Sequence, residues 1–312
     1  MEYPKNLIEF EKIFASEQQC EEYLINLRWK DGFKCPKCKT NEYWNLSRHR
    51  VGCKNCSYKF SITSGTIFEQ SNKPLSQWYR AIWLMVAQKN GMSALGLQKI
   101  MGFGSYQTAW TWLHKLRRLT VFPDRRLLNG QIEVDETYLG GKKKGNRGRG
   151  AEGKIPVIIA VELMTKGTGR IRLGVLSDVK RKSLKSFIEN NIEKDSDLIT
   201  DGWKAYENIT GYAHTISNDT VNSDDEEILP NVHRVASLLK RWLLGTHQKY
   251  LVGKNSQHYL DEFTFRYNRR KSLSRGLLFQ RVMEQAVKHE PIKYAEINAS
   301  CTDKEIKRSG KN

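Results

Sequence analysis

Residues Gln131–Leu139 read QIEVDETYL, an alternation of apolar and polar side chains that is typical of a half-buried β-strand and that carries Asp135. A second stretch, LITDGW at Leu198–Trp203, is a short apolar run that ends with Asp201 in front of a glycine. Carboxylates that meet at strand ends can hold hard divalent cations beside a phosphate, and Mg²⁺ needs only one or two of them from the protein. Asp135 and Asp201 therefore predict a site for metal-assisted phosphoryl transfer, although an isolated Asp-Gly more often forms a solvated turn.

The charge of the chain points to a polyanionic partner. Its 312 residues include 52 Lys and Arg against 34 Asp and Glu, so the formal net charge is +18 and the pI is near 9.6. Such an excess attracts nucleic acid first and an acidic membrane surface second. No apolar run reaches the roughly 18 residues of a spanning helix, and the first residues, MEYPKNLIEFEKIF, lack the pattern of a signal peptide. The sequence therefore predicts double-stranded DNA as the partner and no membrane segment.

Four of the six cysteines form two CxxC pairs separated by fourteen residues, namely Cys35, Cys38, Cys53 and Cys56. Each pair puts two thiolates on one tight turn, and two such turns complete a tetrahedral zinc site. Four protein ligands leave no open position for water, so this Zn²⁺ is predicted to be structural. The alternatives are chance cysteines or two redox pairs. Basic residues around the cysteines either contact DNA or form a solvated face, while Cys20 and Cys301 are expected to be ordinary thiols.

The segment 75–120 has helical periodicity and resembles a helix-turn-helix. Ser93–Met101 is expected to be the first helix of the motif, Gly102–Ser105 the turn and Tyr106–Leu119 the recognition helix. The N-terminal residues of a recognition helix read base edges in the major groove. The candidates for base contact are Tyr106, Gln107 and Thr108, and those for phosphate contact are Lys115, Arg117 and Arg118. Trp110, Leu113 and Leu116 are expected in the core. The alternative is a plain three-helix packing module.

The remaining pattern predicts a multidomain, mixed α/β layer fold. Strands are expected at 43–46, 58–62, 131–139, 155–164, 170–176, 197–200 and 213–216, and helices at 7–28, 182–192, 233–244 and 257–270. The expected domains are 1–65 (N-terminal helix and zinc ribbon), 70–122 (DNA-binding helices), 128–290 (catalytic domain) and 291–312 (charged tail).

Several motifs follow one another in a fixed order: VDETYLGGKKKG, TDGWKAY, VHRVASLLKRWLLGTH and YLDEFTFRYNRR. Together they resemble the DDE transposases of bacterial insertion sequences, most closely the group that carries an N-terminal zinc ribbon. The resemblance extends over nearly the whole chain, from PKNLIEF to YNRRKSLSRGLLF. It implies an RNase H-like catalytic domain that cuts DNA ends and joins them to a target, in the cytoplasm at the bacterial nucleoid.

The resemblance makes Asp135 the first metal ligand and Asp201 the second. The third acidic position of such enzymes falls on His233, seven residues before Lys240. Seven residues are about two helical turns, so both side chains share a helix face and Lys240 is expected to reach a DNA phosphate. His233 either ligates a metal, where imidazole suits manganese or zinc better than magnesium, or orients water, or has only a structural role. If it is not the ligand, the carboxylate could come from Glu133 on the Asp135 face of the strand, Glu136 on the other face, or the Asp224–Glu227 cluster.

The implied reaction is in-line displacement at phosphorus with Mg²⁺ or Mn²⁺ and no covalent enzyme intermediate. Water first frees a 3′-hydroxyl at the element end, and that hydroxyl then attacks the target DNA. Two basic runs are expected to lie on phosphates, or else to be solvated: Arg269–Lys271 and the loop residues Lys142, Lys143, Lys144, Arg147 and Arg149. Two ends must be brought together, so the resemblance implies a homodimer or a higher oligomer on DNA.

Two other functions fit parts of the pattern. A non-catalytic DNA-binding regulator derived from a transposase is favoured by the histidine at position 233 and opposed by the two intact aspartates. A metal-dependent nuclease or resolvase would cut DNA without joining it. The sequence therefore predicts a transposase, and the regulator and the nuclease or resolvase remain the two alternatives.

Overall fold

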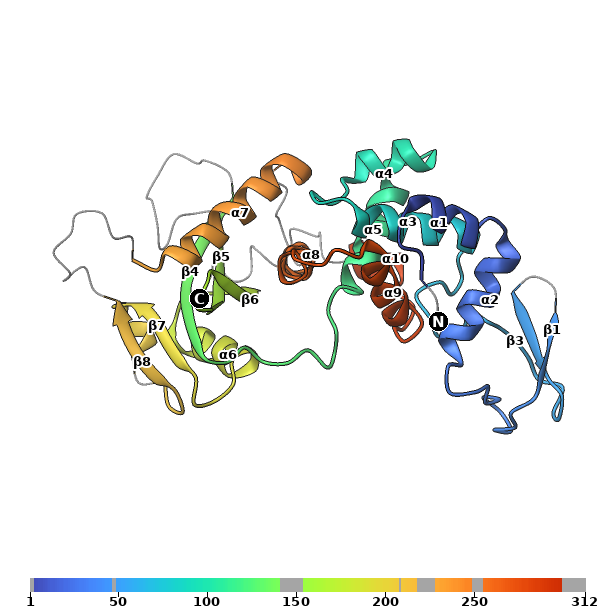
Figure 1. Cartoon of the computed structure of the whole chain (residues 1–312), viewed down its shortest axis with the longest axis horizontal. Coiled ribbons are helices and arrows are strands. Elements are labelled where there is room, and N and C mark those ends of the chain that lie inside the picture. The colour runs from blue at the N-terminus through green and yellow to red at the C-terminus, as the bar shows by residue number, and fades with distance from the viewer. Residues whose placement is uncertain are drawn as a thin grey trace. The chain divides into compact units, whose positions relative to one another are not determined.

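The computed structural model describes residues 3–46, 49–140, 154–207, 209–217, 228–248 and 255–298. They form two compact units. The first runs to Phe122 and resumes at Ser272, and the second comprises Pro123–Lys271, so the second is inserted into the chain of the first (Figure 1). No helix in the described ranges combines the length and the apolar character needed to cross a bilayer.

The N-terminal part of the first unit combines two short helices with a small antiparallel sheet. The helices are α1 (Leu7–Ile13) and α2 (Glu17–Arg28), and the sheet has the order β1 (Tyr43–Leu46), β2 (Arg50–Cys53), β3 (Lys59–Ser61). The prediction of one helix over 7–28 is wrong, because Ser16 starts a new one. The Ser16 hydroxyl accepts from the N–H of Gln19 (3.3 Å), and the Gln19 side chain accepts from the N–H of Ser16 (2.9 Å). This capping box fixes the start of α2.

Five further helices complete the first unit: α3 (Leu75–Ala87), α4 (Ala94–Met101), α5 (Tyr106–Arg118), α9 (Arg275–Ala286) and α10 (Tyr294–Asn298). Phe279 of α9 is fully buried, and its ring centroid lies 5.5 Å from those of Phe10 and Phe14. Ile297 of α10 is also fully buried. The sequence predicts that the catalytic domain extends to residue 290 and that a charged tail follows from residue 291. In the structure, residues 272–298 instead belong to the first unit and supply side chains to its core.

The second unit is built on one five-stranded sheet. Its elements are β4 (Gln131–Leu139), β5 (Ile155–Leu163), β6 (Thr168–Val175), α6 (Arg181–Asn191), β7 (Asp197–Asp201), the 3₁₀ turn η1 (Lys204–Tyr206), β8 (Ala213–Ser217), α7 (Pro230–His247) and α8 (Ser256–Asn268). The strand order is β6-β5-β4-β7-β8; the first three strands pair antiparallel, and β4, β7 and β8 pair parallel. The mixed α/β sheet agrees with the predicted RNase H-like domain.

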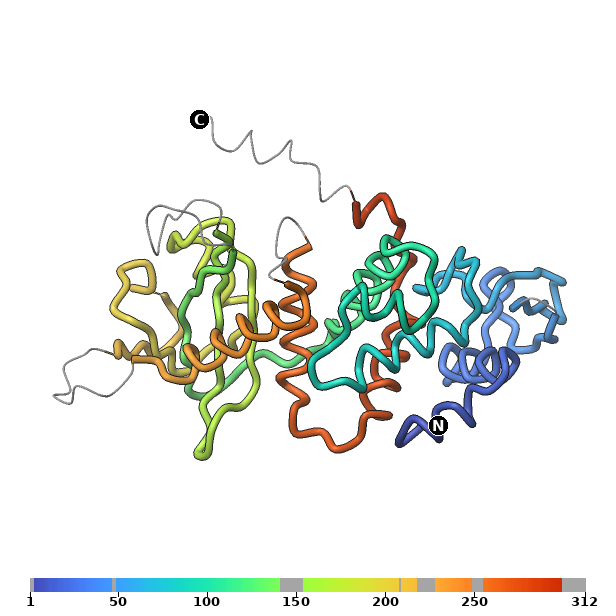
Figure 2. Tube along the Cα trace, turned by 90° about the horizontal axis from the view of Figure 1, so that it is seen from above, coloured from blue at the N-terminus to red at the C-terminus, as the bar shows by residue number. Residues whose placement is uncertain are grey.

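Helices cover both faces of this sheet, because its strands carry apolar side chains on both. One core joins Ile159, Ile171 and Leu173 to α7 and α8, and the other joins Val134 and Ile158 to α6. Figures 1 and 2 show α7 (orange) lying across β4 and β5. By strand alternation, odd-numbered residues of β4 face α7 and even-numbered residues face α6. Asp135 therefore lies on the α7 face.

The outer edge of strand β6 is closed by amide side chains of α8. Asn268 accepts from the N–H of Ile171 (2.8 Å) and donates to its carbonyl oxygen (3.1 Å). Gln257 accepts from the N–H of Val175 (2.9 Å) and donates to the carbonyl oxygen of Leu173 (3.2 Å). These bonds replace those of a further strand, so α8 protects an edge that could otherwise pair with another chain.

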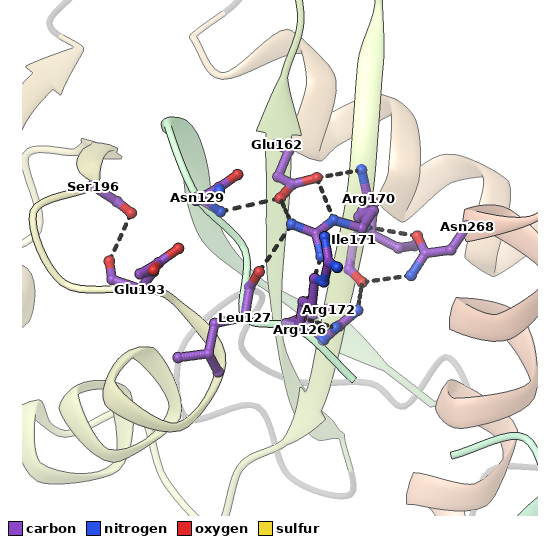
Figure 3. Close-up of polar contacts among 10 residues, drawn as sticks. All are labelled: Arg126, Leu127, Asn129, Glu162, Arg170, Ile171, Arg172, Glu193, Ser196 and Asn268. Atoms are coloured by element: carbon purple, nitrogen blue, oxygen red, sulfur yellow. Dashed lines mark hydrogen bonds and ion pairs between the residues drawn. The ribbon is translucent and has the colours of Figure 1, made fainter. Parts of the chain in front are cut away.

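A network of arginines around Glu162 holds the first residues of the second unit against the sheet (Figure 3). Arg170 donates through Nε to Glu162 (2.9 Å) and through a terminal nitrogen to the carbonyl oxygen of Leu127 (2.9 Å). Arg172 is buried and donates to the carbonyl oxygen of Arg126 (2.7 Å). Desolvation first, and the neighbouring arginines second, lower the pKa of Arg172 to about 10. The segment 126–127 is thereby tied to β5 and β6.

Candidate active site and zinc site

Asp135 and Asp201 stand on neighbouring parallel strands at the same level. The register pairs Gln131 with Asp197 and Glu133 with Ile199, and the same offset of 66 residues leads from Asp135 to Asp201. Asp135 and Asp201 each follow the last paired residues, Glu133 and Ile199, by two positions, and the charge of Asp201 contributes to the raised pKa of Asp135. Ile199 packs into the core on the α7 side, so alternation puts Asp201 on that face with Asp135. The structure thus brings together two aspartates far apart in the sequence.

Helix α7 carries His233 to the same place. The Nε2 atom of His233 lies 3.6 Å from Oδ2 of Asp135. Two ligands of one cation, each about 2.1 Å from it, are separated by about 3 to 4.2 Å. The distance therefore permits His233 and Asp135 to share a metal ion.

Negative charge accumulates at Asp135. Burial, reinforced by the charges of Glu136 and Asp201, raises the pKa of the Asp135 carboxyl to about 6. The backbone N–H of Glu136 donates to Oδ1 of Asp135 (2.7 Å) and partly offsets this effect. A partly buried carboxylate beside other acids gains from a bound cation, so the donor set fits a divalent metal.

The two acids that flank Asp135 already have partners. The oxygens of Glu133 accept from the side-chain nitrogen of Asn231 (2.7 Å) and from the N–H of Val232 (2.9 Å), both at the start of α7. Glu136 accepts from the hydroxyl of Tyr206 (2.9 Å), on the opposite face of the sheet. Their opposite faces agree with the predicted alternation. The Asp224–Glu227 cluster lies outside the described residues.

Within the described ranges, only the cysteine cluster brings three or more potential ligand atoms within 4.8 Å of one another. Asp135, Asp201 and His233 do not reach this limit as a trio. Asp201 accepts through Oδ1 from the backbone N–H of Trp203 (3.3 Å), which turns the chain directly after strand β7. The site is therefore a close Asp135–His233 pair with a second aspartate on the neighbouring strand.

Lys240 lies on the surface of α7, two turns after His233. Partial desolvation, followed by the positive charge of Lys154, lowers the pKa of Lys240. Two cations close together form a suitable place for a phosphate. Five other predicted phosphate contacts fall outside the described residues: Lys142, Lys143, Lys144, Arg147 and Arg149.

The four predicted zinc ligands converge in the first unit. The Sγ atoms of Cys38 and Cys53 are 3.4 Å apart, and those of Cys35 and Cys56 are 3.6 Å apart. A zinc tetrahedron with bonds of about 2.3 Å has sulfur edges of about 3.8 Å, so the cluster has the size of a zinc site. A hydrogen bond from the Thr40 hydroxyl, first among several, lowers the pKa of Cys38 to about 5 and favours the thiolate that binds zinc.

The two halves of the zinc site have the same backbone fold. The N–H of Lys39 donates to the carbonyl oxygen of Cys35, and the N–H of Ser57 donates to that of Cys53, each at 3.0 Å. Lys39 and Ser57 both have left-handed backbones, with φ of 64° and 57°. Each turn therefore aims both sulfurs of its CxxC pair at one point, which is the arrangement that the spacing predicts.

The helix-turn-helix elements form as predicted. Ser93 caps α4, Gly102 ends it in the left-handed conformation that glycine favours, and Ser105 caps α5. Tyr106 and Gln107 are exposed and Thr108 is half-buried at the start of α5, so they are accessible for base contacts.

The second half of α5 differs from the prediction. Arg117 is 1% exposed, so its assignment to a phosphate is wrong; position 117 lies one turn after Leu113 on the buried stripe. Lys115 and Arg118 are half-buried, and desolvation lowers the pKa of each, while Glu296 of α10 opposes the shift.

The core residues of α5 also differ in part from the prediction. Leu113 and Leu116 are buried as predicted. The core tryptophan is Trp112, whose ring centroid lies 3.6 Å from that of Trp78, and Trp110 is only half-buried.

The sequence assigned no role to two residues near the aspartates, Tyr206 and Trp203, and considered Glu133 only as an alternative metal ligand. Glu133 binds the start of α7, Tyr206 binds Glu136, and Trp203 follows Asp201 with 37% of its surface exposed. The motif TDGWKAY contains two of them, but its spacing alone does not say which aromatic ring is buried.

Two family models match this chain. Residues 127–268 match the ISXO2-like transposase domain, and residues 15–59 match the transposase zinc-ribbon domain. A relative described as an uncharacterized protein in transposable element ISH50 of Halobacterium salinarum is 27% identical over 256 residues, which cover 74% of this chain and 85% of that protein. The matched ranges contain the four cysteines and both aspartates with His233. The chain therefore carries a transposase zinc-ribbon domain followed by a DDE-type, ISXO2-like transposase domain.

Proposed function

We propose that this protein is a transposase that binds the ends of a bacterial insertion sequence and catalyses divalent-metal-dependent cleavage and strand transfer in the cytoplasm. The observation that carries the proposal is the close pair of Asp135 and His233, with Nε2 of His233 3.6 Å from Oδ2 of Asp135, and Asp201 on the neighbouring strand of the same face. Two neighbouring carboxylates and an imidazole form a donor set for Mg²⁺ or Mn²⁺.

Each residue has a separate task in this proposal. Asp135, Asp201 and His233 would hold the cations, which supply Lewis-acid stabilisation to the attacking and leaving oxygens. Lys240 would hold a phosphate next to the scissile bond. Water hydrolyses the phosphodiester at the element end and releases a 3′-hydroxyl, which then displaces a 3′-oxygen at a target phosphodiester.

DNA recognition would reside in the first unit. Tyr106, Gln107 and Thr108 are accessible at the start of α5 and would contact base edges, while the zinc ribbon would hold the backbone. Joining two ends to one target calls for two active sites, so the active form would be a homodimer or a higher oligomer on DNA.

The test is a strand-transfer assay with labelled element ends, target plasmid, and Mg²⁺ or Mn²⁺. Asp135→Ala and Asp201→Ala should abolish joining while end binding persists. Asp197→Ala is a matched control, because Asp197 lies on the same strand as Asp201 but binds Gln131 and Thr215. Joining at a near wild-type rate by either active-site variant would overturn the assignment.

A second function has one observation in its favour, the histidine at the position where related enzymes carry an acid. A non-catalytic regulator would bind the ends without cutting them in either metal. A nuclease or resolvase would cut without joining. The same assay separates the three.

A further inference from the structure

Helix α7 does not cap its own N-terminus. Leu229 occupies the cap position with φ of 54°, a left-handed backbone, and offers no side-chain acceptor, while Pro230 starts the helix. The first N–H groups of a helix need acceptors from outside the helix. Glu133 of β4 supplies one such acceptor: one of its oxygens accepts from the backbone N–H of Val232 (2.9 Å), and the other accepts from the side-chain nitrogen of Asn231 (2.7 Å).

This contact fixes the place of His233. Glu133 is 4% exposed and precedes Asp135 by two residues on the same face of β4, and Val232 directly precedes His233. The carboxylate therefore joins the strand that carries Asp135 to the helical turn that carries His233. A negative charge at a helix N-terminus is also favourable, because the helix dipole is positive there.

A similar contact holds the chain after Asp201. Tyr206 in η1 is fully buried, and its hydroxyl donates to Glu136 at 2.9 Å. Glu136 is the neighbour of Asp135 on β4, on the opposite face of the sheet. The segment from Asp201 to Tyr206 is therefore bonded to β4 directly beside the first aspartate.

We propose that Glu133 and Glu136 are positioning residues and not metal ligands: Glu133 sets His233, and Glu136 sets the segment after Asp201, both relative to Asp135. The inference rests on the proposed function for its catalytic meaning. Its structural content, the contacts of Glu133 with α7 and of Glu136 with Tyr206, has a test that does not depend on strand transfer.

The first test measures hydrogen exchange of the Val232 amide in the full-length protein, without DNA or added divalent metal. Glu133→Ala should remove much of the protection at the first turn of α7, and Glu133→Gln, whose amide oxygen can still accept, should restore most of it. Unchanged protection in Glu133→Ala would overturn the inference. This readout does not depend on whether the protein recombines DNA.

The second test follows strand transfer as a function of Mn²⁺ concentration. Glu133→Ala should lower the maximal rate on the order of 10- to 100-fold, since small displacements of a catalytic group have such effects, while the half-saturating Mn²⁺ concentration stays the same. Glu133→Gln should recover most of the rate. A ligand role would instead raise the half-saturating Mn²⁺ concentration in Glu133→Gln on the order of 10-fold or more, and that result would overturn the inference.

The same comparison applies to the second contact. Tyr206→Phe removes only the hydroxyl, and Glu136→Gln keeps an acceptor for it, so Tyr206→Phe should lower the maximal rate and Glu136→Gln should lower it much less. The reverse order would contradict the assignment of Glu136.

Asp178→Ala is the matched control. Its carboxylate accepts from the N–H of Lys180 (3.0 Å) and the hydroxyl of Ser183 (2.7 Å) at the start of α6, on the other face of the sheet. It should lose local protection at α6 with no change in strand transfer. A loss of strand transfer equal to that of Glu133→Ala would show that loosening the start of any helix on the sheet has the effect, and would overturn the specific role of Glu133. Wild-type protein that joins no ends refutes the proposed function and leaves the exchange result intact.

Discussion

Asp135 is a partly buried carboxyl whose ionisation is unfavourable in the metal-free fold. Its pKa rises from about 3.9 in the unfolded chain to about 6. The folded state therefore binds the proton more tightly, and stability falls as the pH rises through this window. Above pH 7 the charged form lowers the stability of the metal-free unit on the order of 2–3 kcal/mol.

We expect Asp135→Asn to stabilise the metal-free protein by about 1–2 kcal/mol at pH 7.5 and to have little effect near pH 4, since it removes the charge. Urea unfolding, monitored by the hydrogen exchange of the β4 amides, measures this difference in the free energy of unfolding. Added Mn²⁺ should reverse the order, because the wild type alone gains a bound metal. A variant less stable than the wild type at both pH values would contradict the expectation.

His233→Glu should shift the metal preference. A carboxylate at this position, next to Asp135, suits Mg²⁺ better than imidazole does. We therefore expect the Mg²⁺-supported rate of strand transfer to rise several-fold relative to the Mn²⁺-supported rate. Equal losses with both metals would indicate that His233 is not at a ligand position. His258→Glu, on α8, provides a control for the added charge.

At the scale of elements, α8 closes the edge of β6. Asn268→Ala removes two hydrogen bonds to Ile171 and leaves both backbone groups without them, so we expect a loss of about 1–3 kcal/mol in the free energy of unfolding. Asn190→Ala is the matched control, because Asn190 is exposed on α6 and bonds within its own helix. Denaturant unfolding of both variants compares them; equal small losses would contradict the role of the edge.

The zinc ribbon depends on its metal, because its own apolar core is small and consists mainly of Phe33, Cys35 and Cys53 with five aromatic or cysteine neighbours around them. Removing zinc should unfold β1–β3 while the sheet of the second unit keeps its exchange protection. Cys56→Ser should lower the zinc content, and Cys20→Ser, which alters a buried thiol of α2, should not. Elemental analysis of zinc per chain checks both; full zinc in Cys56→Ser would contradict the assignment.

The sequence predicts the helices and strands well, but it predicts poorly which side chains contact one another in the fold. Strand β4, the zinc cluster and the two helices of the helix-turn-helix follow from short-range patterns, so all are found where expected. Arg117 and Glu133 show the limit, because a charged residue at a given position can face the core or another element, and spacing within one segment does not decide which. The resemblance supplied the pairing of Asp135 with Asp201, which depends on strand register across 66 residues.

At the scale of the molecule, the chain of the first unit is interrupted by the second. Phe279, Val282 and Met283 are fully buried in the first unit, although they follow the whole catalytic domain in sequence. We expect a chain that ends at Lys271 to lose cooperative unfolding of the first unit while the second unit still folds. Domain-resolved hydrogen exchange measures both; an unchanged first unit would contradict the assignment of α9.

The split of the first unit also has a consequence during synthesis. A ribosome must translate the entire inserted sheet before α9 leaves the exit tunnel, so the aromatic cluster around Phe279 stays incomplete until α9 has emerged. A prematurely terminated product would carry all the residues of the catalytic centre with an unfinished N-terminal unit. The first unit is thus begun before the inserted unit and completed after it.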